Sequence, residues 1–452
     1  MALALFLTCS VFAAEKDIPV KLLTFKEFYQ KVLAYYPKLK QQNADVNSAI
    51  AAKLQAVTGF LPRVQGSFDV TQGNDPVYVF GSLLRENAFT QNDFALSKLN
   101  TPSSHTTNTF AITGQMPIFD AFQTISRVHA AKLKIASARD EEAFTRMEAF
   151  LVAAQAYLQA IAVEKIALVV NATHDAGEGD IRQAQELKDK GLILGADFYA
   201  ARMIEGNIAQ LKNQLVQEKQ AVEIMLNILM GEDLLKPVAI DSDFSKSSLV
   251  IQPLQAWLDQ AFKMRPDFAA VDKAIAAQTI EIKREKSTVL PTIDAFGEAR
   301  EDTHRLGSSG GKNYTVGIKA QMDFFDPAHP ARMRIAKEEL KKLEADKAAL
   351  KDMIAKDLVN EYARYMTISS NLPLAGNILD DAKQAADFML PLHREGKKSI
   401  ADLLQIRWAY LNAVRDYYSL AGDEKASQTR LLFLSGQLDG TRLEEAVKII
   451  GE

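Results

Sequence analysis

Histidines are the residues of this chain that could bind a metal ion, because imidazoles at short helical spacing are common metal ligands. They stand far apart in this sequence, at positions 105, 129, 174, 304, 329 and 393, and form no HExxH motif. His174, Asp175 and Glu178 lie close enough together to hold a cation, but the glycines beside them favour a solvated helix break. The histidine pattern therefore predicts no metal site.

The other residues offer no catalytic set. Residues 307–313, GSSGGKN, resemble a phosphate-binding loop, but the spacing is one residue short and Asn313 replaces the required Ser or Thr. We interpret this segment as a flexible turn. Cys9, the only cysteine, lies in an N-terminal segment that we expect to be removed, which leaves no thiol for catalysis. Because no nucleophile, base and orienting group converge, we expect neither an enzyme nor a cofactor.

Charge and the N-terminus narrow the classes of protein. The chain holds 53 Lys and Arg against 57 Asp and Glu and has no basic block, which argues against nucleic-acid binding. Residues 1–14 are typical of a signal peptide cleaved after residue 13 or 14; a buried apolar N-terminus and a lipoprotein acylated at Cys9 are the alternatives. We expect no transmembrane helix, since Gln155 and Gln159 interrupt the most apolar run, residues 149–163. An exported chain of this kind is periplasmic, secreted or an outer-membrane β-barrel.

An internal duplication organises the chain. Residues 23–62 match residues 252–291, with their prolines at the same internal spacing. Farther along, residues 191–231 match residues 396–436 without a gap. Each half therefore repeats the same order of parts.

Four segments of about ten residues alternate between apolar and polar side chains, which is the pattern of a membrane-spanning β-strand. They come in pairs, at residues 61–71 and 107–119 and at residues 293–300 and 314–324. The residues that we expect to face lipid are Val64, Phe68, Phe110, Ile112, Val316 and Ile318. Those that we expect to face a lumen are Gln65, Asp69, Thr109, Lys319 and Gln321. A soluble sandwich with one wet face is the alternative.

Four strands cannot close a barrel, because two edges stay unpaired. Three identical chains would supply twelve strands and remove every edge. Two features depart from the regular pattern: Phe296 interrupts the polar face of the third strand, and an apolar insert occupies residues 73–104. We expect this insert to pack either over the outer mouth of a barrel or against a neighbouring protomer.

Two further segments, residues 120–190 and 326–395, are long enough for helices of about 105 Å at 1.5 Å per residue. Apolar residues recur at alternating spacings of three and four in residues 144–161 and again in residues 208–229, which predicts coiled-coil seams. Glycines in residues 171–180 and a proline in residues 371–373 disfavour helix. We therefore expect each long helix to bend or unwind locally at these places.

The two matching segments, residues 23–62 and 252–291, each end in Leu-Pro and are each followed by a strand pair that closes on an IFD or FFD turn. This order of parts resembles the TolC-like outer membrane efflux protein family. The resemblance covers nearly the whole chain and implies an α+β membrane protein of the Gram-negative outer membrane. Internally duplicated long-helix hairpins would form a periplasmic α-barrel, and four β-strands per protomer would complete a twelve-stranded trimeric β-barrel. The implied partners are two further copies of the chain, outer-membrane lipid, a periplasmic adaptor (membrane fusion protein) and an inner-membrane pump.

The most specific matches to that family are two helix turns, which the resemblance places at the periplasmic entrance. In each a glycine would end the long helix and an aspartate would open the returning one. The gate residues are then Gly191, Asp197, Gly396, Lys398, Asp402 and Gln405. Three copies of Asp402 would form an acidic ring, and Lys398 would pair with Asp197 of the neighbouring hairpin. Gln405 stands where the family often has a second acidic residue, and plain helix caps remain the alternative for both aspartates.

The expected parts follow in order along the chain. They are a signal peptide (1–14), a helix (15–60), a β-hairpin (61–119) with an external loop (73–104), a helix pair (120–230) with its tip turn (191–197), an equatorial linker (231–252), a second helix (253–290), a second β-hairpin (291–325), a second helix pair (326–436) with its tip turn (396–402) and an equatorial tail (437–452). The expected function is a passive duct of a tripartite efflux or type I secretion system for small molecules, metal ions or polypeptides. A periplasmic coiled-coil scaffold without a pore is the alternative, and the cargo stays open.

Overall fold

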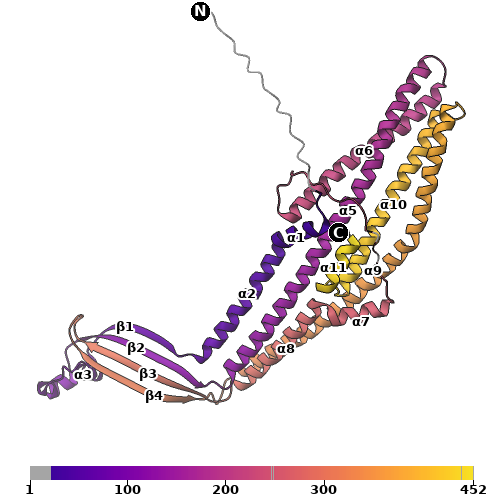
Figure 1. Ribbon diagram of the computed structural model, residues 1–452. Coiled ribbons are helices and arrows are strands. Elements are labelled where there is room, and N and C mark those ends of the chain that lie inside the picture. Colours follow the sequence, from indigo (N-terminus) through magenta and orange to yellow (C-terminus); the bar gives the residue numbers. More distant parts are fainter. Residues whose placement is uncertain (1–21, 246, 248, 439, 451–452) are drawn as a thin grey trace, which may run out of the picture. The chain divides into compact units, whose positions relative to one another are not determined.

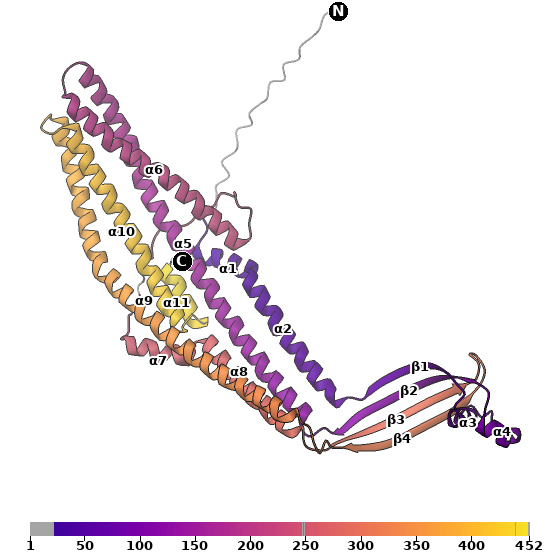
Figure 2. The same cartoon turned by 180° about the vertical axis from the view of Figure 1, so that it is seen from behind.

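The computed structural model describes residues 22–245, 247, 249–438 and 440–450, so the expected signal peptide and Cys9 lie outside the described residues. Helices and strands follow one another twice in the same order (Figures 1 and 2). The first copy consists of α1 (Phe25–Tyr35), α2 (Pro37–Val57), η1 (Thr58–Phe60), β1 (Arg63–Gly73), α3 (Pro76–Arg85), η2 (Gln91–Phe94), α4 (Leu96–Asn100), β2 (His105–Phe119), α5 (Gln123–Asp189) and α6 (Gly195–Met230). The second consists of α7 (Leu254–Met264), α8 (Pro266–Ser287), β3 (Thr292–Thr303), β4 (Gly311–Gln321), α9 (His329–Arg394) and α10 (Ile400–Leu434), followed by α11 (Gly440–Ile450).

Proline splits the leading helix of each copy at equivalent positions. Pro37 begins α2 and Pro266 begins α8, while the residues before them, Tyr36 and Arg265, have ψ angles of 109° and 122°. Proline pushes the preceding residue out of the helical region but is well suited to the first helical position. The expectation of one helix at the start of each copy was therefore wrong, because each start contains two.

The two long helices contain 67 and 66 residues, as their sequence predicted, but neither unwinds at the expected break. Residues 171–180 are helical and belong to α5. Gly177 allows close packing of α6 at this place, because a Cβ there would lie 2.2 Å from the Glu205 carboxylate. Pro373 lies inside α9, where it removes one backbone hydrogen bond from a helix long enough to continue on both sides.

The chain divides into two compact units, and the first comprises Met1–Gln42, Glu142–Pro266 and Leu350–Glu452. Its largest fully buried side chains include Phe25, Phe150, Tyr157 and Trp257. The Phe25 ring meets the rings of Phe150 and Tyr157 edge to face, each at a centroid distance of 5.4 Å. Burial of such a side chain contributes about 1.5 to 3 kcal/mol, so this cluster holds α1 against α5.

A second apolar cluster in the same unit joins the two helix hairpins near their tips. In it α6 returns along α5 and α10 returns along α9 (Figures 1 and 2). The buried members come from α5, α6 and α10, and they include Val170, Phe198, Ile204, Ile208, Leu403, Leu404 and Leu411. In α6 the buried residues Ile208, Leu211 and Leu215 follow the spacings of three and four of the predicted coiled-coil seam.

One helix of the described residues, α5, is long and apolar enough to cross a membrane by length and composition alone. The sequence analysis expected no such segment. The apolar window has a mean hydropathy of 1.4, and half of it is buried inside the protomer. Since Phe150 and Ile161 in this helix are fully buried, its apolar character fits a core helix.

The second unit, Asn43–Glu141 and Asp267–Ala349, contains a four-stranded antiparallel sheet in the order β1-β2-β3-β4. The central pairing joins β2 of the first copy to β3 of the second, with Asn108 opposite Thr303 and Gly114 opposite Gly297. The four strands fall where the alternating pattern predicted them. In one chain the outer edges of β1 and β4 have no strand partner among the described residues.

The insert between β1 and β2 folds into α3, η2 and α4 and packs on its own sheet. The Asn313 side chain of β4 donates a hydrogen bond to the Arg85 carbonyl of α3 at 3.1 Å. Gly311 lets this helix end approach, because a Cβ there would lie 1.7 Å from the same carbonyl oxygen. The apolar insert is therefore anchored to β4 of its own chain.

Candidate functional site

The sheet register places all six residues expected to face lipid on one face. Phe68 pairs with Phe110, and Ile112 pairs with Ala299, which in turn pairs with Tyr314. Residues two apart along a strand share a face, which adds the remaining members of the set. The six are Val64, Phe68, Phe110, Ile112, Val316 and Ile318, and each is at least 47% exposed in the single chain.

The opposite face carries all five residues expected to line a lumen. Asp69 pairs with Thr109, which pairs with Asp302, and Lys319 pairs with Asp294. The alternation of side chains places the other members, Gln65 and Gln321, on this face as well.

A charged network on this polar face was missed by the sequence analysis. The Asp302 side chain is fully buried, accepts a hydrogen bond from Thr109 Oγ1 at 2.7 Å and accepts two from the Arg300 guanidinium at 2.8 and 2.9 Å. Arg300 also lies 3.5 Å from Glu298. Such charge-assisted bonds are stronger than neutral ones, so they rigidify the polar face between β2 and β3.

Phe296, the apolar residue on the polar face, has a packing role. It lies opposite Gly317 on β4, and a Cβ on that glycine would lie 2.7 Å from the Phe296 ring. The ring therefore covers the space above a residue without a side chain, a known way to stabilise glycine in a sheet.

The first tip turn, after α5, ends in a left-handed glycine as expected. Gly191 has a φ of 71°, and the Leu192 N–H donates to the Leu187 carbonyl at 2.9 Å. This is the six-to-one bond of a Schellman cap. Asp197 lies in the first turn of α6, whose N-cap residue, Leu194, makes no side-chain cap hydrogen bond.

The second tip turn has the same glycine but a different helix start. Gly396 has a φ of 72°, and α10 begins with a complete capping box. The Asp402 N–H donates to Ser399 Oγ at 3.1 Å, and the Ser399 N–H donates to the Asp402 carboxylate at 3.2 Å. Asp402 and Gln405 are both exposed, one turn apart. Asp402 thus caps α10 and also presents its charge to solvent.

The link predicted between Lys398 and Asp197 does not form within one chain. Both residues line a groove of about 660 Å³ between the two tips, yet no ion pair joins them among the residues that the structure places. The neighbouring Lys397 pairs with Glu395 at 2.6 Å. The Lys398 carbonyl accepts a hydrogen bond from His393 Nδ1 at 3.1 Å, which closes the turn locally.

A different ion pair connects the two hairpins just above the tips. Arg407 of α10 forms a hydrogen-bonded ion pair with Asp180 of α5, and only 13% and 23% of these side chains are exposed. No local pattern predicts this pair, because its partners are 227 positions apart in the chain. Partial burial makes this pair stronger than a solvated one.

The cluster interpreted as a solvated helix break, His174 with its neighbours, is a partly buried ion-pair site. His174 Nδ1 lies 2.7 Å from Glu205 Oε1 of α6, and Asp175 lies 3.4 Å from Lys212. Burial raises the pKa of Glu205, and the hydrogen bond from His174 opposes that rise. These contacts fasten α6 to α5.

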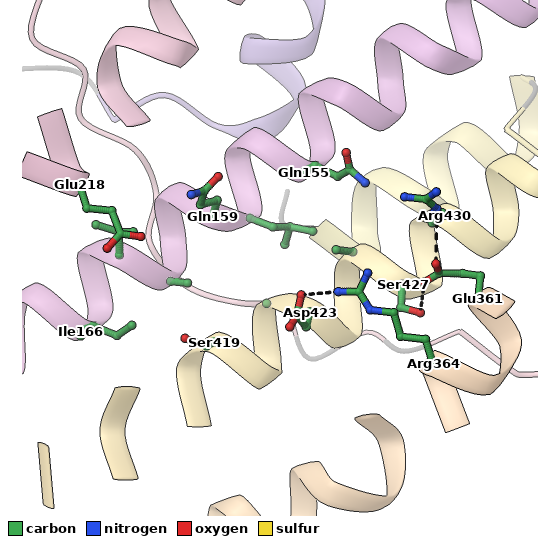
Figure 3. Close-up of a pocket in the computed structure, with 15 residues that line it drawn as sticks. Gln155, Gln159, Ile166, Glu218, Glu361, Arg364, Ser419, Asp423, Ser427 and Arg430 are labelled. Atoms are coloured by element: carbon green, nitrogen blue, oxygen red, sulfur yellow. Dashed lines mark hydrogen bonds and ion pairs between the residues drawn. The ribbon is translucent and has the colours of Figure 1, made fainter. Parts of the chain in front are cut away.

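Farther from the tips, a cavity of about 360 Å³ lies among α5, α6, α9 and α10 (Figure 3). Arg364 pairs with Asp423 at 2.8 Å, and Arg430 lies 3.4 Å from the buried Glu361 carboxylate. Ser427 donates to the same carboxylate at 2.5 Å. Because both arginines form their ion pairs between α9 and α10, these pairs serve the packing of the two helices.

The structure also gathers histidines that the sequence left scattered. Nitrogen and oxygen ligand atoms of Glu86, His105 and His304 all lie within 4.8 Å of one another at the end of the sheet that carries the insert. Local spacing in the sequence does not reveal this group, because the three residues come from three different elements.

The chain is similar to known outer membrane proteins in part of its sequence and in its fold. Residues 257–437 match the family model described as outer membrane efflux protein, and no curated protein sequence matches the chain. The Campylobacter jejuni CmeC outer membrane channel superposes with a TM-score of 0.75 at 14% identity, over 94% of this chain and 89% of that one. The outer membrane protein VceC of Vibrio cholerae gives 0.73 at 14% identity, over 91% and 96%. The Neisseria gonorrhoeae MtrE outer membrane channel in its open state gives 0.70 at 12% identity, over 94% and 89%. The fold expected from the sequence is confirmed.

Proposed function

We propose that this chain is a TolC-like outer membrane efflux protein and forms, as a trimer, the outer-membrane duct of a tripartite efflux or type I secretion system. The family match over residues 257–437 and the structural likenesses support an outer-membrane channel over the alternative of a scaffold without a pore. The observation that carries the proposal is the sheet register, which leaves one face apolar and exposed across β1 to β4 and the other polar. In a bilayer such a sheet turns its apolar face to lipid and its polar face to an aqueous lumen.

Trimerisation follows from the unpaired edges of the sheet. A spanning sheet with open edges would leave backbone N–H and C=O groups without partners in hydrocarbon. Pairing β4 of one protomer with β1 of the next, three times, closes a barrel of twelve strands.

Energy for transport would come from an inner-membrane pump that reaches the tips through a periplasmic adaptor. Both arginines that line the cavity among α5, α6, α9 and α10 are paired with carboxylates, and we expect passive conduction and no catalysis by this chain. The cargo class would be set by the pump.

The tip turns are the proposed gate. Asp402 is exposed at the start of α10, so threefold symmetry could bring three of its carboxylates together, where they would attract cations and repel anions. The pair between Asp180 and Arg407 is the proposed latch, because it ties α10 to α5 close to the tip. Lys398 contributes less to closure, since it has no ion pair with Asp197 inside the protomer.

Cysteine labelling in intact cells tests the proposal. A membrane-impermeant maleimide should modify Gln65→Cys and Lys319→Cys through the water-filled lumen and leave Phe68→Cys and Ile318→Cys unmodified in lipid. The four variants are matched in pairs on β1 and β4, and loss of Cys9 with the expected signal peptide would leave no background thiol. Equal labelling of both faces would contradict a barrel. A chain that enters the outer membrane but shows no heat-sensitive trimer band on gels would contradict the assembly.

A further inference from the structure

We propose that Glu86, His105 and His304 bind one divalent transition-metal ion of the zinc type at the end of the sheet that carries the insert. Their ligand atoms lie within 4.8 Å of one another. Two imidazole nitrogens and one carboxylate oxygen suit zinc and its neighbours in the first transition row, whereas magnesium and calcium prefer oxygen alone.

Three different elements hold these ligands. Glu86 caps the C-terminal end of α3, His105 begins β2, and His304 directly follows β3. The backbone around His304 is fixed by the buried Asn108 side chain, whose amide donates to the Thr303 and His304 carbonyls at 3.1 Å each. The site is therefore built on ordered backbone and joins the insert to both hairpins.

The Glu86 carboxylate lacks a full set of partners. Its side chain is only 2% exposed, Oε2 lies 2.9 Å from His105 Nε2, and Oε1 is buried without a hydrogen-bond partner in the described part of the chain. A buried acceptor of this kind is costly, and the carbonyls at a helix C-terminus make the position unfavourable for an anion. A cation beside Oε1 would offset both effects.

One ring nitrogen of His304 is held by a backbone carbonyl. Its Nδ1 lies 2.9 Å from the Thr106 carbonyl oxygen, which can only accept, so Nδ1 carries the hydrogen. The neutral ring then keeps its lone pair on Nε2. A backbone carbonyl that holds the second ring nitrogen is the usual support for a metal-bound histidine.

Metal binding requires a small rearrangement. The Glu86 and His105 atoms, at 2.9 Å, are closer than the roughly 3.3 Å that separates two ligands about 2.05 Å from a tetrahedral zinc ion. The ion would take the place of the hydrogen between these two atoms, and the neutral His105 ring would carry its hydrogen on Nδ1 instead, which leaves the lone pair on Nε2 for the metal. The imidazole rings of His105 and His304 are stacked at a centroid distance of 4.6 Å, so the His304 ring must also turn to aim Nε2 at the ion. Water would fill the fourth position.

Calorimetric titration of the purified trimer with zinc chloride tests the site. The trimer should carry an affinity tag without histidines and be stripped with a chelator beforehand. We expect one ion per protomer and a binding curve that saturates at this ratio. Glu86→Gln, His105→Gln and His304→Gln should each weaken binding by at least the roughly 10- to 100-fold that loss of a supporting partner costs.

His129→Gln is the matched control, because this histidine belongs to α5 and to no ligand cluster; it should bind zinc like the unaltered protein. Unchanged affinity in the Glu86→Gln and His304→Gln trimers, or only weak binding that does not saturate, would overturn the proposal. Should the variants fail to form trimers, titration of the unaltered trimer with cobalt(II) decides the question. Visible absorption bands of four-coordinate cobalt are expected, and their absence would overturn the site without reference to any variant.

Discussion

The two long helices of the repeat have almost the same length but differ in how much of their apolar surface is buried. Along α5 most of the apolar side chains are buried, and Phe150, Leu158, Ile161 and Val170 are at most 1% exposed. Along α9 many large apolar side chains are exposed, namely Ile335, Met353, Val359, Met366, Leu374, Ile378 and Phe388. The long helix of the first copy therefore packs mainly into the core of the protomer, whereas that of the second also presents an apolar surface, which neighbouring protomers of the proposed trimer would cover.

The largest effect should come from truncating the α5 core. Leu158→Ala, at a side chain only 1% exposed, should cost about 2 to 5 kcal/mol of protomer stability, because it removes buried methyl groups and leaves a cavity. Leu374→Ala in α9, at 59% exposure, should change protomer stability by less than about 0.5 kcal/mol. Urea unfolding followed by the fluorescence of the buried Trp257 measures both.

Leu374→Ala should also change the stability of the trimer. If α9 is an assembly surface, Leu374→Ala should lower the temperature at which the trimer band dissociates on gels while it leaves the unfolding of the protomer unchanged. Equal loss of protomer stability in the two variants would show that the copies do not divide these roles.

The sheet is where the two copies should behave alike. Phe68→Arg on β1 and Ile318→Arg on β4 each place a charge on the apolar face, at an expected cost of roughly 2 to 4 kcal/mol near the bilayer midplane. Gln65→Arg and Gln321→Arg on the polar face should cost much less. Folding into lipid vesicles gives these energies, and a penalty confined to one copy would mean that only one hairpin spans the membrane.

Loss of the ion pair between Asp180 of α5 and Arg407 of α10 should have the next largest effect. Arg407→Ala should remove about 1.5 to 3 kcal/mol of hydrogen bonding to a charged group and raise the resting conductance in planar bilayers. A double-mutant cycle with Asp180→Ala isolates the pair from other consequences of each change. Lys398→Ala is the control and should have a smaller effect on conductance. If Arg407→Ala leaves conductance unchanged, the pair is not a latch.

The smallest effects distinguish the two tips. Asp402→Ala should cost about 0.5 to 2 kcal/mol because it breaks the capping box, whereas Asp402→Asn removes the charge but keeps a hydrogen-bond acceptor. Asp197→Ala should cost only about 0.3 to 1 kcal/mol from the helix dipole, since Asp197 makes no cap bond. Bilayer recordings should show weaker cation selectivity in both Asp402 variants. Selectivity retained in Asp402→Asn would leave Asp402 as a cap alone.

Prediction from the sequence succeeded where the signal was local and periodic. The two-residue alternation around Val64, Phe68 and Val316 predicted the strands and their faces, and Gly191 and Gly396 marked both tip turns. It failed where a residue acts through a distant neighbour. Gly177 suggests a helix break until Glu205 is placed against it.

Long-range pairing also explains why the candidate site was only partly predicted. Glu86 and His304 are far apart in the sequence, and only the pairing of β2 with β3 brings them together. The partner of Arg407 was hidden for the same reason. At Pro37 and Pro266, by contrast, the signal was local, and the helix boundary could have been predicted from the residue type alone.

The pairing of β2 with β3 also has a consequence for how the chain folds. Asn108 and Thr303 are neighbours in the sheet but 195 positions apart in sequence, so a very long loop must close before this ladder can form. Each two-stranded hairpin alone is at best marginally stable. The sheet therefore cannot nucleate until both copies have been translocated, and until then four strand edges are open to aggregation. We expect sheet formation to be the slow step of biogenesis and the period in which the chain depends most on holding chaperones.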